Sequence, residues 1–164
     1  MMFFLFTKIY VIYNAVESKN GDVKTFQSIL IDQPSIVKMR GVYETTLLMQ
    51  AVCYNTSSIV KCLINAGSDV NTVDKNKWNA YHYSVCCGHH DVLKVLINHD
   101  VTNINNVSSN NNTPLHFASR DGHTDCVKLL SSIPHIDVNI RNKQNKTVYD
   151  VTCNNTIKRL LQEH

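Results

Sequence analysis

The sequence predicts an all-α solenoid of helix-turn-helix units joined by β-hairpin-like fingers. Two observations support this fold class. Residues 113–130, with the sequence TPLHFASRDGHTDCVKLL, recur in weaker form at a spacing of 33 or 34 residues, in copies that begin at Thr46, Asn79 and Thr147. In the second half of each copy, apolar residues recur at i, i+3 and i+4, as expected for a helix with one buried face. Units of this kind bury a continuous core only by stacking on their neighbours.

The first helix of each unit should begin at a capping side chain and end at a left-handed residue. Pro114 suits the first helical turn because its missing N–H has no helical partner there. Gly88 and Gly122 are expected to end their helices with a positive φ, and Asn55 to do so less well. The hydroxyl groups that can cap the first helices belong to Thr46, Thr113 and Thr147.

Small residues and apolar stripes predict how the helices pack. A small residue in each first helix would let paired helices approach closely, and these residues are Ala51, Ser84 and Ala118. An apolar stripe in each second helix should face the core. The stripe recurs as Ile59, Cys62 and Leu63, as Val92, Val95 and Leu96, and as Cys126, Leu129 and Leu130.

An extended finger is expected between successive units, for example over residues 66–78 (AGSDVNTVDKNKW). An apolar residue followed by Asn recurs in the fingers as Val70-Asn71, Ile104-Asn105 and Val138-Asn139. The finger tips carry Glu44, Lys77, Asn111 and Asn145. Asn tolerates a positive φ, whereas Glu44 and Lys77 are expected to make their two tips strained or more mobile.

Thr113, Pro114, Leu115, His116 and Ala118 spell the T-P-L-H-x-A signature of the ankyrin repeat, whose units are about 33 residues long. The chain therefore resembles an ankyrin-repeat protein from about residue 10 to its end. The resemblance implies a single domain, 1–164, with a degenerate first unit and a truncated C-terminal cap that lacks about three residues in the turn around Asn154-Asn155. The implied units are 10–41, 42–74, 75–108, 109–142 and 143–164.

The resemblance also implies a non-enzymatic protein–protein interaction module that acts as scaffold, adaptor or inhibitor. In this family, partners bind the concave face formed by the finger tips and the exposed side of the first helices. Trp78 either contacts the partner or packs on its neighbouring finger. By register, the protein-binding positions are Tyr43, Thr45, Tyr54, Lys75, Asn76, Trp78, Cys86, Cys87, Asn110, Asn112, Arg120, Asp121, Lys143 and Lys146.

Two other functions stay open. The chain could be the ankyrin portion of a larger membrane receptor, channel or multi-domain enzyme. It could also bind single-stranded RNA by combining phosphate neutralisation with stacking, through Lys75, Lys77, Trp78, Lys143 and Lys146. The net charge of +3 is too small to favour nucleic acid. We therefore expect another protein as the partner, neither nucleic acid nor membrane, and a monomeric chain.

No motif for catalysis or cofactor binding is present. The sequence lacks G-x-S-x-G, G-x-x-x-x-G-K-[ST], H-E-x-x-H and kinase signatures, so we expect no enzyme activity, no cofactor and no metal. One cluster is rich in possible zinc ligands: His82, Cys86, Cys87, His89 and His90. These side chains are not expected to converge, because His89 follows the turn that ends the helix of Cys86 and Cys87.

The cysteines and the apolar start of the chain bear on its location. A Cys53–Cys86 disulfide is not expected, because stacked helices lie about 8–10 Å apart and a disulfide needs Cα atoms within roughly 7 Å. Reduced thiols favour a cytoplasmic location, with the nucleus as the alternative. Met1–Tyr13 lacks a preceding basic residue and contains Lys8, so it is interpreted as a buried first helix, the stub of a longer chain or a misplaced start rather than a secretory signal.

Overall fold

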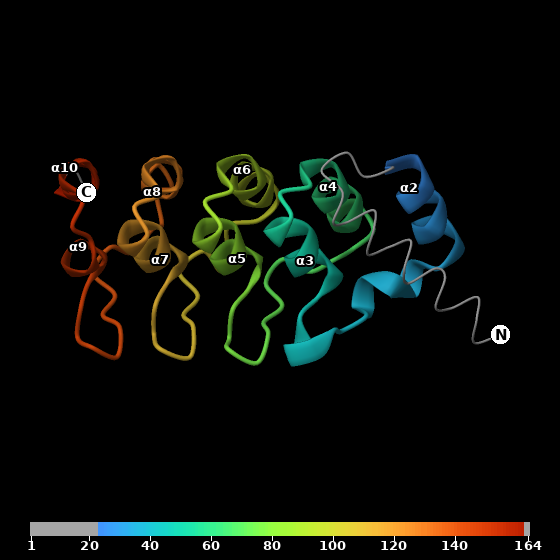
Figure 1. Cartoon of the computed structure of the whole chain (residues 1–164), viewed down its shortest axis with the longest axis horizontal. Helices are drawn as coiled ribbons and strands as arrows, with labels where there is room; N and C mark the ends of the chain where they lie inside the picture. Colours follow the sequence, from blue (N-terminus) through green and yellow to red (C-terminus); the bar gives the residue numbers. More distant parts are fainter. Residues whose placement is uncertain (1–22, 163–164) are drawn as a thin grey trace.

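The computed structural model describes residues 23–162 and confirms the all-α solenoid (Figure 1). The segment Met1–Tyr13 and the expected first helix of unit 10–41 lie outside these residues. The second helices stack in one layer and are α2 (Val23–Asp32), α4 (Ser57–Asn65), α6 (His90–His99), α8 (Thr124–Ser131) and α10 (Asn155–Gln162). The first helices stack in a second layer and are α3 (Leu47–Cys53), α5 (Ala80–Cys86), α7 (Pro114–Arg120) and α9 (Val148–Val151).

The connections are short, and the fingers project from the layer of first helices (Figure 1). Two 3₁₀ turns, η1 (Pro34–Lys38) and η2 (Val42–Glu44), link α2 to α3. Over residues 23–162 no β-strand forms, and the isolated antiparallel bridge there joins Arg40 to Thr46. The fingers are therefore hairpin-like in their hydrogen bonding without being strands.

Reciprocal capping starts the first helices, as the sequence predicts for Thr46 and Thr113. Thr113 Oγ1 accepts a hydrogen bond from the backbone N–H of His116 at 3.3 Å, and His116 Nδ1 accepts from the N–H of Thr113. Thr46 makes the same pair with Met49, and Asn79 replaces the threonine in the next unit. Each pair satisfies two backbone donors that the helix start leaves without intrahelical partners.

The cap of the last unit includes an additional hydrogen bond. The hydroxyl group and the backbone N–H of Thr147 both donate to the Asp150 carboxylate, each at 2.9 Å. Asp150 occupies the slot of His116, and its carboxylate can only accept hydrogen bonds. The threonine hydroxyl therefore donates to Asp150 in addition to its part in the reciprocal cap.

The residues predicted to be left-handed have positive φ. The first helices are followed by Gly88 (φ 70°), Gly122 (φ 79°) and Asn55 (φ 56°). The four tip residues also lie between 57° and 63°, namely Glu44, Lys77, Asn111 and Asn145. This conformation costs roughly 1–2 kcal/mol for a residue with a Cβ, so the finger contacts must offset it.

Backbone hydrogen bonds close each finger and join it to the next. The N–H of Asp74 donates to the carbonyl of Trp78, and Ser108 with Asn112 and Asn142 with Lys146 repeat this contact. Between fingers, a backbone N–H of one tip donates to a backbone carbonyl of the preceding tip at 2.8–3.1 Å. The donor and acceptor pairs are Lys75 and Tyr43, Ser109 and Asn76, and Lys143 and Asn110. The tips therefore form one hydrogen-bonded row along the solenoid.

The core follows the predicted stripes. Ala51, Ser84 and Ala118 have no exposed surface, which fits their expected role in close helix packing. Cys62, Val95 and Leu129 are partly buried at the edge of the core. The fully enclosed stripe residues, each at most 1% exposed, are Ile59, Leu63, Val92, Leu96, Cys126 and Leu130.

The last unit is shortened in its first helix rather than in the turn that the sequence suggested. α9 has four residues, whereas α7 has seven. Residues 121–123 connect α7 to α8, and residues 152–154 connect α9 to α10, so the two connections have equal length. Thr152 is extended (φ −97°, ψ 137°) and leads toward α10, where Ile157 and Leu161 are buried.

Buried imidazoles bridge successive units. His82 Nε2 lies 3.2 Å from the carbonyl oxygen of Asn112, and His116 Nε2 lies 3.2 Å from that of Lys146. For His116, Nε2 faces a carbonyl and Nδ1 accepts the Thr113 N–H, which fits the neutral Nε2–H tautomer. His82 Nδ1 lies 3.3 Å from the Asn79 backbone nitrogen and also 2.7 Å from Asn79 Oδ1. Burial lowers the pKa of His82 to about 4 and also lowers the pKa of His116.

We expect acid to destabilise the chain through His82. The unfolded side chain binds a proton near pH 6.5 and the folded one only near pH 4. Between these values the unfolded state binds more protons, so the free energy of unfolding should fall by up to about 1.4 kcal/mol per pH unit as the pH drops. Above pH 7 the contribution of His82 should be constant. Urea unfolding at several pH values measures this slope.

His82→Gln should reduce the pH slope, since glutamine can still accept the Asn79 N–H but does not titrate. The exposed His135 offers the matched control, and His135→Gln should retain the slope of the parent chain. Comparison between pH 5 and 7 stays above the range in which carboxylates titrate. An unchanged slope in His82→Gln would contradict the assignment.

Gly88 and Gly122 should differ in their tolerance of a side chain. Both have positive φ, but a Cβ at Gly88 would lie 2.7 Å from His123 Nδ1, whereas a Cβ at Gly122 meets nothing within 4 Å. Gly122→Ala should cost roughly 1–2 kcal/mol from backbone strain alone, and Gly88→Ala should cost more. Denaturant midpoints of the two variants measure the difference, and equal losses would show that His123 moves away freely.

Candidate functional site

The predicted site residues lie at equivalent places along the row of finger tips and at the ends of the first helices. Tyr54, Cys87 and Asp121 follow α3, α5 and α7 at the same position of their units. Thr45, Trp78, Cys86 and Asn112 are half-buried. The exposed members are Tyr43, Tyr54, Lys75, Asn76, Cys87, Asn110, Arg120, Asp121, Lys143 and Lys146.

Trp78 packs against the first helices of two units. Its ring centroid lies 4.7 Å from Phe117 and 5.4 Å from Tyr83, both edge-on, and it stacks on His82 at 6.0 Å. The Tyr83 hydroxyl donates to Asp74 at 2.8 Å, and burial together with this bond raises the pKa of Tyr83. The indole therefore fills the space between α5 and α7 below the finger of unit 75–108, rather than packing on a neighbouring finger.

One unit further along, the same region is open. A hollow of about 340 Å³ lies between the fingers of the last two units and the helices α7 and α9. It brings together four residues that the sequence assigned to the site, namely Asn110, Asn112, Arg120 and Lys143. The sequence analysis did not assign the other lining residues, which are His116, Phe117, Asn142, Gln144 and Val151.

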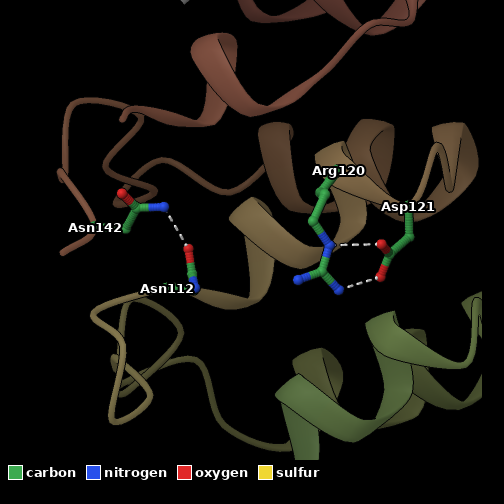
Figure 2. A network of polar contacts seen from close by, with 4 residues as sticks. All are labelled: Asn112, Arg120, Asp121 and Asn142. Atoms are coloured by element: carbon green, nitrogen blue, oxygen red, sulfur yellow. Dashed lines mark hydrogen bonds and ion pairs between the residues drawn. The ribbon is translucent and has the colours of Figure 1, made fainter. Parts of the chain in front are cut away.

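Polar contacts hold the walls of this hollow in place (Figure 2). Asn142 Nδ2 donates to Asn112 Oδ1 at 2.8 Å, which links the two fingers. Arg120 makes a bidentate ion pair with Asp121, with distances of 2.7 and 2.9 Å, and the pair raises the pKa of the guanidinium. The Arg120 guanidinium also lies 4.9 Å from the centre of the Phe117 ring. Arg120 is thus held over the aromatic floor with its charge partly balanced.

The residues that suggested a metal site have other contacts. His82 binds Asn112 as described, and His89 Nε2 lies 2.9 Å from the backbone carbonyl of Cys53. Over residues 23–162 no three His, Cys, Asp or Glu side chains are placed to hold a metal ion. The six cysteines are free thiols.

Three of the thiols gather on neighbouring first helices. Cys53 follows the register of Cys86, but its thiol is hydrogen-bonded to Cys87. This bond, together with His89 and His123, lowers the pKa of Cys87 and raises that of Cys53, although burial opposes the change at Cys87. Cys87 follows the C-terminal end of α5, where the helix dipole disfavours an anion, so the lowering depends on these side chains.

We expect Cys87 to react as a thiolate at lower pH than an ordinary thiol, whose pKa is about 8.5. Its alkylation by iodoacetamide, followed by mass spectrometry in a Cys86→Ala background, should reach half its maximal rate well below that pH. Cys53→Ser keeps a hydrogen-bond donor and should preserve the low midpoint, whereas Cys53→Ala should raise it. Identical profiles for the two variants would contradict the role of Cys53.

No helix within the described part of the chain is long and apolar enough to cross a membrane. The lysines of the RNA hypothesis are divided between two fingers, with Lys75 and Lys77 in one and Lys143 and Lys146 in another.

Comparison with known proteins identifies the repeat. Residues 12–106 and 48–142 match the family described as ankyrin repeats (3 copies). The chain is 29% identical over 82 residues to the Notch-regulated ankyrin repeat-containing protein of Xenopus laevis, covering 48% of this chain and 72% of that protein. The Notch-regulated ankyrin repeat-containing protein A of Danio rerio is 29% identical over 82 residues, which cover 73% of its length. The Homo sapiens protein is 28% identical over 82 residues, which cover 72% of its length. The chain belongs to the ankyrin-repeat family, whose repeats form protein–protein interaction modules.

Proposed function

We propose that this chain binds another protein through the face formed by its finger tips and the exposed ends of its first helices. The row of tips is the observation that supports this proposal most directly. Backbone hydrogen bonds between successive tips hold Tyr43, Asn76 and Asn110 at regular places along one edge. Tyr43 is 66% exposed, and Tyr and Arg are the residue types that often dominate interface energies.

The mechanism would be steric, with no covalent step. The bridges from His82 and His116 hold α5 and α7 against the next finger, so this part of the face is set before a partner arrives. A preorganised surface loses little conformational entropy on binding. Such a surface can hold a partner as a scaffold or adaptor, or cover the partner's own binding site as an inhibitor.

Affinity capture from native lysate tests the proposal. The test variant combines Tyr43→Ala, Arg120→Ala and Lys143→Ala, which truncate exposed residues in three units. Each interface anchor contributes about 1–2 kcal/mol, so partners of this face should be retained at least tenfold less. The matched control truncates three exposed lysines of the second helices, Lys61, Lys94 and Lys128.

Both variants must first show the helicity of the parent chain by circular dichroism. We expect a set of proteins that is lost from the tip variant and kept by the lysine variant. Equal capture by both variants, or loss only from the lysine variant, would place the interaction surface elsewhere.

A further inference from the structure

Each unit repeats the residue positions of the unit before it. The neighbours of a residue can therefore be compared with the neighbours of the equivalent residue in the next unit. Trp78, Asn112 and Lys146 each follow the left-handed tip residue of their finger. A shift of 34 residues carries Trp78 to Asn112. It also carries the three ring neighbours of Trp78 to other residues, because His82 becomes His116, Tyr83 becomes Phe117 and Phe117 becomes Val151.

Those three equivalents all line the hollow. His116, Phe117 and Val151 form its inner wall, and Asn112 forms its edge. The space that the Trp78 indole fills between α5 and α7 therefore has its counterpart in the hollow between α7 and α9. Two of the residues that line the hollow are smaller than their equivalents in the preceding unit. Asn112 replaces Trp78, and Val151 replaces Phe117.

The position of Asn112 keeps the hollow open. Its side chain is bound sideways to Asn142 at 2.8 Å, toward the neighbouring finger (Figure 2). Phe117, on the α7 side of the hollow, already has aromatic and cationic neighbours. The Trp78 ring packs edge-on against it, and the Arg120 guanidinium lies 4.9 Å from its centroid. Phe117 and Val151 are thus the apolar lining residues of a hollow whose other walls are polar.

We infer that the hollow binds an aromatic side chain of indole size, presented by an acidic segment of the partner protein. This inference rests on the proposed function and names the chemistry of its partner. The aromatic part follows from Trp78, which fills the equivalent space in the preceding unit. The exposed side-chain amides of Asn110 and Gln144 line the hollow and can accept a hydrogen bond from an indole N–H.

The acidic part follows from the charges around the hollow. Arg120 and Lys143 line it, and Arg141 and Lys146 lie on the same finger as Lys143. Two carboxylates lie in the same region, Asp121 paired with Arg120 and Asp150 bound by Thr147, so four positive side chains there outnumber two negative ones. Carboxylates flanking the aromatic residue would therefore meet an excess of positive charge, which favours encounter with the partner.

NMR titration of the ¹⁵N-labelled chain tests the inference with defined peptides. The probe is the peptide EDGWGDE, and the comparison peptides are EDGAGDE and KRGWGRK. We expect saturable shifts of the Asn112, His116 and Val151 amide signals with EDGWGDE, with a Kd on the order of 1 mM for so small a ligand. EDGAGDE should bind at least tenfold more weakly, and KRGWGRK should bind more weakly than the probe.

Two tryptophan variants separate filling of the hollow from simple exposure of an indole. Asn112→Trp places an indole where Trp78 lies in the preceding unit and should abolish the shifts. Ser28→Trp, at an exposed position of α2 away from the binding face, adds the same side chain without entering the hollow and should leave the shifts unchanged. If Asn112→Trp fails to fold, the comparison of the tryptophan and alanine peptides on the parent chain still decides the outcome.

The inference is overturned if the alanine peptide binds as well as the tryptophan peptide, if shifts arise elsewhere, or if Asn112→Trp binds like the parent chain. Equal binding of the basic peptide would overturn the acidic part. Shifts caused by oligouridine but not by the probe would also overturn it and indicate a stacking site for RNA. In the lysate capture, partners that the tip variant loses but Asn112→Trp retains would overturn this inference alone and leave the proposed function standing.

Discussion

The hydrogen bond from a buried imidazole to the carbonyl of the next finger is the contact on which the arrangement of this chain depends. His82 and His116 each use Nδ1 to complete the cap of their own helix and Nε2 to reach the following finger at 3.2 Å. Both rings are almost fully enclosed, where an unpaired polar group would cost about 1–3 kcal/mol. The same side chain therefore fixes a helix start and the distance between two units.

The finger row accompanies this spacing. The backbone groups of successive tips come within 2.8–3.1 Å of one another, and two of the three contacts lie beside an imidazole bridge. The tip residues keep a positive φ even where they are Glu44 or Lys77, because the closed finger leaves them no alternative. Because these contacts use backbone atoms, the side chains at the tips can differ between units without changing the arrangement of the fingers.

The ends of the solenoid show what happens when the bridging residue is replaced. Met49 can cap Thr46 through its sulfur atom, and Asp150 can hold Thr147, but neither has a ring nitrogen that could reach a further finger. α9 is also shorter than the other first helices and ends at Val151. Val151, its last residue, stands where the preceding unit has Phe117, so the side chain that would close the space below the last finger is smaller and the hollow arises where the repeat is least regular.

The sequence alone determined the repeat, the limits of most helices and the left-handed positions. These features depend on local rules, such as capping by Thr113, the positive φ of Gly122 and the apolar period of α8. Three features needed the tertiary structure: the burial of Trp78 against Phe117, the Cys53–Cys87 contact, and the hollow beside Asn112. Each depends on side chains about 30 residues or more apart, whose distance is set by the stacking of units rather than by neighbours in sequence.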